Sequence, residues 1–83
     1  MNQKHRRTLE AVFEDPVRSN IAWRAIEAMF KAAGADVSER AGSLVCLVLN
    51  GIRAVFHRPH GKETDKGAVV SVREFLVKAG VMP

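Results

Sequence analysis

Two apolar runs separated by a two-residue polar break dominate the hydrophobic pattern of the chain. Six consecutive apolar residues, Leu44 to Leu49, precede Asn50-Gly51, and a second run, Ile52 to His57, follows. Asn and Gly tolerate the positive φ that a type I′ turn requires, so this pattern predicts a β-hairpin with a two-residue loop. The unbroken apolar run of the first strand predicts a central strand, or one that is buried on both faces.

The hairpin fixes which side chains lie opposite one another, because the loop length sets the register. We expect the pairs Leu49–Ile52, Val48–Arg53, Leu47–Ala54, Cys46–Val55, Val45–Phe56 and Leu44–His57. Side chains alternate along a strand, so every second residue shares a face. The core face is expected to carry Ile52, Ala54 and Phe56. The opposite face is expected to carry Leu44, Cys46, Val48, Arg53, Val55 and His57.

Two helices are expected before the hairpin. The first covers residues 4–14 and ends at Asp15-Pro16, since the residue before a proline is disfavoured in the α region. The second follows the candidate caps Ser19-Asn20 and ends at Gly34. Trp23, near its start, is expected to cover the core with its indole N–H close to water. The apolar stripes of the two helices are Leu9, Val12 and Phe13, and Ala22, Ala25, Ile26, Met29, Phe30 and Ala33.

The remaining segments predict one more strand, a loop and a last helix. Residues 35–40 are a short strand candidate, and residues 59–65 form a loop after the hairpin. Thr64 or Asp65 can cap a helix over residues 66–79. Its apolar stripe is Val69, Val72, Phe75, Leu76 and Ala79.

The order of elements, α-α-β-β-β-α, predicts an α+β fold. A three-stranded antiparallel sheet with two helices on one face is the simplest arrangement that buries these stripes. We expect residues 1–18 to form an N-terminal helical extension and residues 19–83 to form the main domain. The apolar character of the opposite sheet face requires a cover. The N-terminal helix, a second copy of the chain in a homodimer, or a different protein would each supply one.

Composition narrows the functional classes. The chain has 83 residues, enough for one small domain with a thin core, and 13 Lys and Arg against 9 Asp and Glu. The net charge of +4 suits a polyanionic partner such as nucleic acid. A single cysteine, Cys46, is expected to be a buried thiol in a reducing, cytoplasmic setting. No apolar run has the length of a membrane span.

Candidate chemistry gathers at the end of the second hairpin strand, in the sequence His57-Arg58-Pro59-His60. Histidine suits proton transfer near neutral pH, and arginine suits phosphate binding. His57 and His60 could ligate a metal together with Cys46, but nothing nearby completes a four-ligand zinc site. We therefore expect neither a metal nor another cofactor.

Gly42-Ser43 before the first hairpin strand and the closing segment HGKETDKGAVVSVREFLVKAG, residues 60–80, resemble the HicA family of bacterial toxins. The resemblance covers roughly residues 20–81. It implies a double-stranded-RNA-binding-like α-β-β-β-α fold and metal-independent cleavage of messenger RNA. It also implies neutralisation by a partner antitoxin of the HicB type.

The chain departs from the family pattern in two places. Leu44 stands where the family has its active histidine after the Gly-Ser pair, and residues 1–18 are additional. The expected register places His57 directly opposite Leu44, so an imidazole would be supplied by the neighbouring strand. His57 and His60 are thus the candidate catalytic residues. The candidate RNA-binding residues are Arg53, Arg58, Lys62 and Lys66.

Three functions remain compatible with the sequence. The first is a toxin ribonuclease that uses His57. The second is a non-catalytic RNA-binding domain of the same fold, whose binding would be sensitive to salt. The third is a protein-interaction module that uses the apolar sheet face. Exposure of His57 would favour the first, and burial of His57 beneath Phe13 would argue against it.

Overall fold

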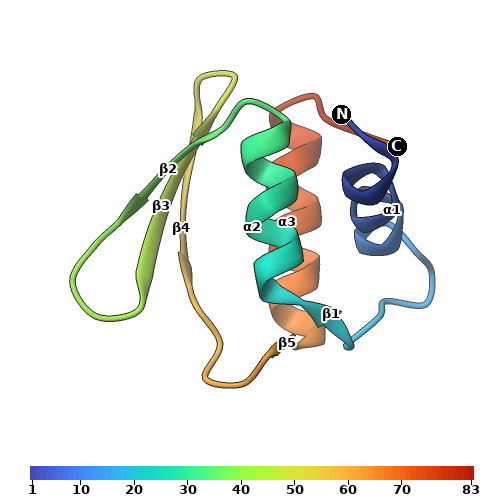
Figure 1. The fold of residues 1–83 in the computed structure, drawn as a ribbon, viewed down its shortest axis with the longest axis horizontal. Coiled ribbons are helices and arrows are strands. Elements are labelled where there is room, and N and C mark those ends of the chain that lie inside the picture. The colour runs from blue at the N-terminus through green and yellow to red at the C-terminus, as the bar shows by residue number, and fades with distance from the viewer.

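A computed structural model describes residues 1–83, which form three layers (Figure 1). An antiparallel sheet forms one layer, the helix pair α2 and α3 packs on one of its faces, and α1 lies on the far side of that pair. The elements are α1 (Gln3–Val12), β1 (Ile21–Ala22), α2 (Trp23–Ala32), β2 (Asp36–Glu39), β3 (Leu44–Leu49), β4 (Ile52–His57), β5 (Glu63–Thr64) and α3 (Lys66–Lys78). The fold is α+β and is consistent with a double-stranded-RNA-binding-like domain that carries an extra N-terminal helix.

The β3–β4 hairpin has the predicted loop and register. Asn50 and Gly51 adopt positive φ values of 51° and 81°, and all six expected pairs form, from Leu49–Ile52 to Leu44–His57. The Asn50 side chain also donates a hydrogen bond of 2.8 Å to the carbonyl oxygen of Ala79. This bond ties the turn to the end of α3. β3 is the central strand of the order β2-β3-β4, as its continuous apolar run predicted.

The core lies between the sheet and the helix pair and continues to α1. Four aromatic rings form its centre, and the centroids of neighbouring rings lie 5.6 to 6.1 Å apart; the rings belong to Trp23, Phe30, Phe56 and Phe75. The inner face of β3 contributes Val45, Leu47 and Leu49, which are almost fully buried. Leu9 and Val12 of α1 belong to the same hydrophobic cluster. The extension is therefore packed as part of one core.

The start of α2 corrects a sequence-based expectation. Ser19-Asn20 do not cap this helix, because Ala22 occupies the N-cap position and makes no side-chain cap bond. Ile21 and Ala22 instead form the short strand β1, which pairs with Thr64 and Glu63 of β5. The segment expected to be a loop thus contains a strand. Neither two-residue strand has a hydrophobic period that could predict it, since each forms only by pairing with the other.

The end of that same segment agrees with the prediction. Asp65 is the N-cap of α3, and its side chain accepts a 2.8 Å hydrogen bond from the backbone N–H of Ala68. Gly80 follows the helix with a positive φ of 78°, as expected of a residue after a helix C-terminus. None of the three helices is long and apolar enough to cross a membrane.

No helix of the chain covers the outer face of the sheet. α1 contacts α2 and α3 rather than the sheet, and Arg73 of α3 fastens it by donating to the carbonyl oxygens of Val12 (3.0 Å) and Glu14 (2.7 Å). Of the three covers considered, the N-terminal helix is therefore excluded. On the outer face, Val48 is 38% exposed and Val55 is 54% exposed.

Candidate functional site

The hairpin register places His57 on the outer face of the sheet beside Leu44. The neighbouring pair is hydrogen-bonded, with the Arg58 N–H donating to the Ser43 carbonyl oxygen at 2.8 Å. Leu44 and His57 therefore form a non-hydrogen-bonded pair, the kind in which opposed side chains lie closest, with Cβ atoms about 5 Å apart. His57 is exposed and does not lie beneath Phe13. Its imidazole is free to meet a partner from solution.

A shallow hollow lies where β4, the segment after it and the start of α3 meet. Both His57 and His60 line it, although three positions separate them in the sequence. Ser43, the N-cap residue Asp65, and Gly67 in the first turn of α3 also line it. N–H groups at a helix start have no partner within the helix and favour anions. The Asp65 carboxylate opposes that effect, although one of its oxygens is occupied by the helix cap.

The other candidate residues occupy different positions. Arg58 contributes to the lining of the hollow, whereas Arg53, Lys62 and Lys66 do not. Arg53 lies four residues before His57 on β4, about 13 Å away along the strand. Lys62 and Lys66 are exposed on either side of β5. Of the six candidates, the structure thus brings together His57, Arg58 and His60.

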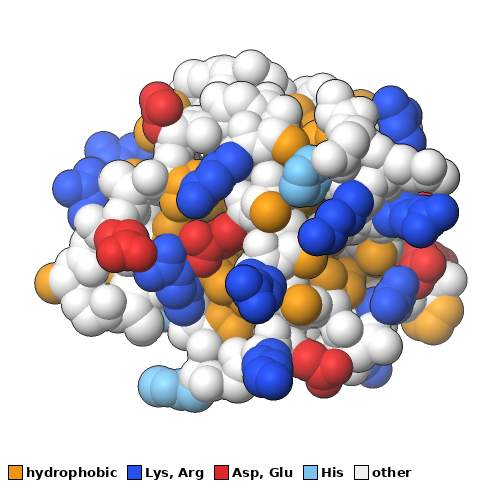
Figure 2. Space-filling model, in the orientation of Figure 1, with side chains coloured by type: hydrophobic (Ala, Val, Ile, Leu, Met, Phe, Trp, Pro, Cys, Tyr) orange, Lys and Arg blue, Asp and Glu red, His pale blue; other side chains and the backbone are white.

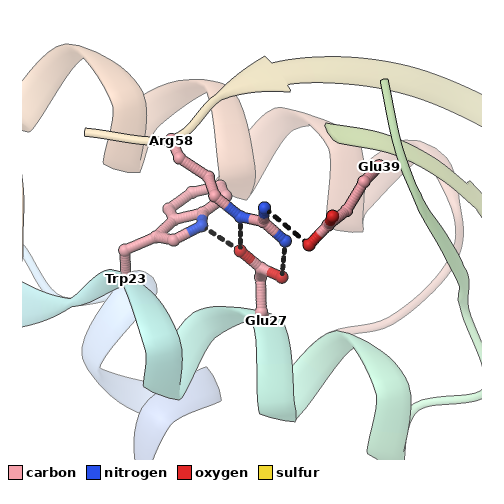
Figure 3. A network of polar contacts seen from close by, with 4 residues as sticks. All are labelled: Trp23, Glu27, Glu39 and Arg58. Atoms are coloured by element: carbon pink, nitrogen blue, oxygen red, sulfur yellow. Dashed lines mark hydrogen bonds and ion pairs between the residues drawn. The ribbon is translucent and has the colours of Figure 1, made fainter. Parts of the chain in front are cut away.

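The Arg58 guanidinium is already engaged by two carboxylates (Figure 3). Its Nε and Nη2 donate to the two oxygens of Glu27 at 2.8 and 3.0 Å, and its Nη1 donates to Glu39 at 2.9 Å. The Glu27 carboxylate also accepts a hydrogen bond from the indole N–H of Trp23. These contacts join α2, β2 and the segment after β4. Arg58 therefore fixes the backbone between the two histidines, and its charge is neutralised within the protein.

The electrostatics of this network follow from its geometry. Hydrogen bonding to Arg58 lowers the pKa of Glu27, although partial burial acts in the opposite direction, and the Trp23 N–H lowers it further. The same pairing with Glu27, with a contribution from Glu39, raises the pKa of Arg58. Both groups are therefore held in their charged forms.

Sequence reasoning missed Glu27, whose carboxylate accepts the hydrogen bond of the Trp23 N–H. Trp23 and Glu27 are four residues apart on a helix, a spacing that brings side chains together, so this contact had a local signal. Glu27 and Arg58 are 31 positions apart in the sequence, so no local signal indicates their pairing.

Cys46 lies on the outer face between two arginines. The residue is 3% exposed, as expected of a buried cysteine. Burial raises its pKa, but the nearby guanidinium groups of Arg53 and Arg40 outweigh that effect, and the net pKa lies below the ordinary value. The outer face thus combines apolar side chains with positive charge. No group of three or more His, Cys, Asp and Glu side chains is arranged to hold a metal ion.

Comparison with known proteins gives one match. The model of the family described as HicA toxin of bacterial toxin-antitoxin matches residues 23–81, close to the range over which the sequence resembles that family. No curated protein and no solved structure matches the chain. The matched range begins at the first residue of α2, so it excludes α1 and β1.

Proposed function

The chain belongs to the HicA family of bacterial toxins, and from that premise we propose that it cleaves messenger RNA without a metal ion, as the toxin of a type II toxin–antitoxin system. The family match covers the three-stranded sheet and both helices that pack on it. Leu44 interrupts the family pattern at the position of the active histidine. The proposal therefore requires another residue to supply the imidazole.

The location of His57 is the observation that carries this proposal. It lies directly opposite Leu44, on the same face of the sheet, and lines one hollow together with His60. An imidazole on β4 is thus displaced from the family position by about 5 Å, the width of one strand pair. Such a shift keeps the group on the same patch of surface.

Two imidazoles around one hollow can supply the proton transfers that RNA cleavage needs. One histidine removes the proton from the ribose 2′-hydroxyl, and the 2′-oxygen attacks the adjacent phosphorus. The other donates a proton to the 5′-oxygen as its bond to phosphorus breaks, which leaves a 2′,3′-cyclic phosphate and a 5′-hydroxyl. Imidazole suits both roles near neutral pH. We assign them to His57 and His60.

Negative charge on the phosphorane requires stabilisation by nearby positive groups. Lys62 and Lys66 lie within two residues of positions that line the hollow, and they are our candidates for this role together with the start of α3. Arg53 lies farther along β4, where it would contact a neighbouring phosphate. We give Arg58 a structural role, because a phosphate would have to displace Glu27 and Glu39 from its guanidinium.

Exchanging the residues of the Leu44–His57 pair tests the assignment. The purified chain and its variants are incubated with a long single-stranded transcript in a chelator, and cut ends are mapped. We expect His57→Leu to slow cleavage by roughly 10² to 10⁴-fold, the usual contribution of general acid–base catalysis. The double variant Leu44→His/His57→Leu returns an imidazole to the family position. We expect it to recover most of the lost activity.

Circular dichroism melting of each variant provides the control for folding. Unchanged cleavage in a folded His57→Leu variant would contradict the role of His57. Salt-sensitive RNA binding without cleavage by any form would instead identify a non-catalytic RNA-binding domain, the second function compatible with the sequence.

The open outer face of the sheet supports the proposal of a protein partner. Leu44, Val48 and Val55 give it an apolar character, and His57 lies at its edge. We propose that an antitoxin of the HicB type covers this face and shields His57 from RNA. A second copy of the chain is the alternative occupant, and it would appear as a dimer of the isolated chain.

A further inference from the structure

A second hollow, separate from the histidine site, lies between α1 and α2. Residues of both helices line it, and we call it the α1–α2 groove. Lys4 of α1 and Arg24 and Lys31 of α2 supply its free positive charge, since Arg58, which also lines it, is paired with carboxylates. Lys and Arg side chains are spread over the face of the molecule that carries α2 (Figure 2).

The three cations of this groove form no ion pair within the chain, although the charge of Lys31 also helps to lower the pKa of Glu27. Glu27 is the only carboxylate in its lining, and its two oxygens are bound by Arg58. No Asp or Glu oxygen lies within 4 Å of the side-chain nitrogens of Lys4, Arg24 or Lys31. Three cations thus remain available to an anionic ligand.

The spacing of these cations suits a chain of phosphates. Arg24 and Lys31 lie on one side of α2, seven residues and roughly 10.5 Å apart. Two cations this far apart can each contact a different phosphate of one nucleic-acid strand. Lys4 faces them from the other wall of the groove.

The lining favours a phosphate backbone over an acidic peptide. Its apolar members are Trp23, Ala25 and Ala28. Trp23 is only 6% exposed and its N–H is occupied, so it offers no platform for a stacked base. Two alanines form no pocket that could anchor an apolar side chain of a peptide. His5 and Thr8 complete the lining, so the groove offers charged and polar groups. Such groups contact a phosphate backbone without reading its sequence.

We propose that the α1–α2 groove binds the phosphate backbone of RNA at a position outside the histidine site. The inference rests on the proposed function, since it assumes that RNA is the ligand of this chain. One wall of the groove is α1, which lies outside the range matched by the family model. The N-terminal helix thus adds a contact to the RNA-cleaving domain and retains the RNA near the histidines.

Fluorescence anisotropy with a labelled 20-nucleotide single strand of 2′-O-methyl RNA tests the proposal. This probe has no free 2′-hydroxyl, so binding is measured independently of cleavage. Binding to the full chain is titrated at several KCl concentrations. The groove variant is Arg24→Gln/Lys31→Gln, and Lys4→Gln tests the opposite wall. The matched control is Arg6→Gln/Arg7→Gln, which removes the same charge from exposed positions that do not line the groove.

We expect the groove variant to bind the probe roughly tenfold more weakly at low salt. The slope of log affinity against log salt concentration should be smaller in magnitude by about 1.4 for this variant, since each phosphate contact on a single strand contributes about 0.7 to the slope. Lys4→Gln should weaken binding in the same direction, and the control should bind nearly as tightly as the wild type.

Equal weakening by groove and control variants would overturn the proposal in favour of a diffuse effect of net charge. Binding of the probe by the groove variant at the wild-type affinity would also overturn the proposal. That result would leave the proposed cleavage at the histidine site standing, because cleavage is tested separately. A third result would also overturn the proposal: the wild type does not bind the RNA probe but binds a polyglutamate peptide, and the groove variant does not bind that peptide. The ligand of the groove would then be an acidic protein segment.

Discussion

At the residue scale, the chain depends on a few polar side chains whose partners lie far away in the sequence. Arg58 is the clearest case, because it joins carboxylates from α2 and β2 while its own backbone N–H bonds to Ser43. Glu27, the central partner, is mostly buried, with 13% of its side chain exposed. Removing it would leave part of a guanidinium without its partner.

Replacement of Glu27 by Gln should lower the free energy of unfolding by about 1.5 to 3 kcal/mol at neutral pH, the range for a hydrogen bond to a charged group. The folded pKa of Glu27 lies below its ordinary value of 4.5. Its contribution is therefore present above that value and is lost as the pH falls through the lower, folded-state pKa. Urea denaturation between pH 3 and pH 7 measures this dependence.

The matched control is Glu39→Gln, since the Glu39 side chain is 74% exposed. Exposed ion pairs contribute at most about 1 kcal/mol, so this variant should remain close to the wild type. Equal stability losses from the two substitutions would contradict a central role for Glu27.

At the scale of elements, the hairpin determines the register on which the site depends. A register shift of one residue would move His57 to the core face and Phe56 to the outer face. The turn prevents this shift through the positive φ of both loop residues and through the bond from Asn50 to α3.

Gly51→Ala should destabilise the protein by about 1 kcal/mol, because a Cβ is disfavoured at a φ of +81° even though the space around it is open. For a domain of this size, that loss corresponds to a decrease in Tm of about 4 to 8 °C. Gly61→Ala is the control. Gly61 does not have a positive φ in the strained range, and an added Cβ would also meet open space there. The Tm of the Gly61→Ala variant should therefore equal or exceed that of the wild type.

The helices show which local signals were sufficient. Asp65, one of the two predicted N-cap candidates, and Gly80 do limit α3, because a cap and a C-terminal glycine act through bonds within a few residues. The predicted start of α2 was wrong, because Ile21 and Ala22 pair with β5 as strand β1 and do not belong to the helix. That pairing brings together residues more than 40 positions apart, so no local pattern reports it.

At the scale of the whole molecule, α1 is part of the core and also forms one wall of the α1–α2 groove. Its apolar side packs on α2 and α3, while Lys4 faces the groove. A domain of 83 residues has a thin core, so the apolar contacts of one helix contribute a large share of its total stability.

Leu9→Ala should therefore destabilise the protein by about 2 to 5 kcal/mol, the range for removing a buried leucine side chain. Thermal unfolding followed by circular dichroism measures the loss. Glu10→Ala on the exposed side of the same helix is the control, and it should change stability by no more than about 0.5 kcal/mol. Little effect of Leu9→Ala would mean that α1 is only loosely attached.

The sequence by itself determined the hairpin, its six pairs, the fold class and the position of His57 opposite Leu44. These features follow from strand alternation, a two-residue turn and helical periodicity, all of which act between residues that are close in the chain or joined by a fixed loop. Only the tertiary structure decided that α1 packs on the helices and leaves the sheet face open. It also decided that Glu27 and Glu39 neutralise Arg58 and that Lys4 faces Arg24 and Lys31 across a groove. Such contacts depend on the relative positions of whole elements, which the packing of the complete core sets.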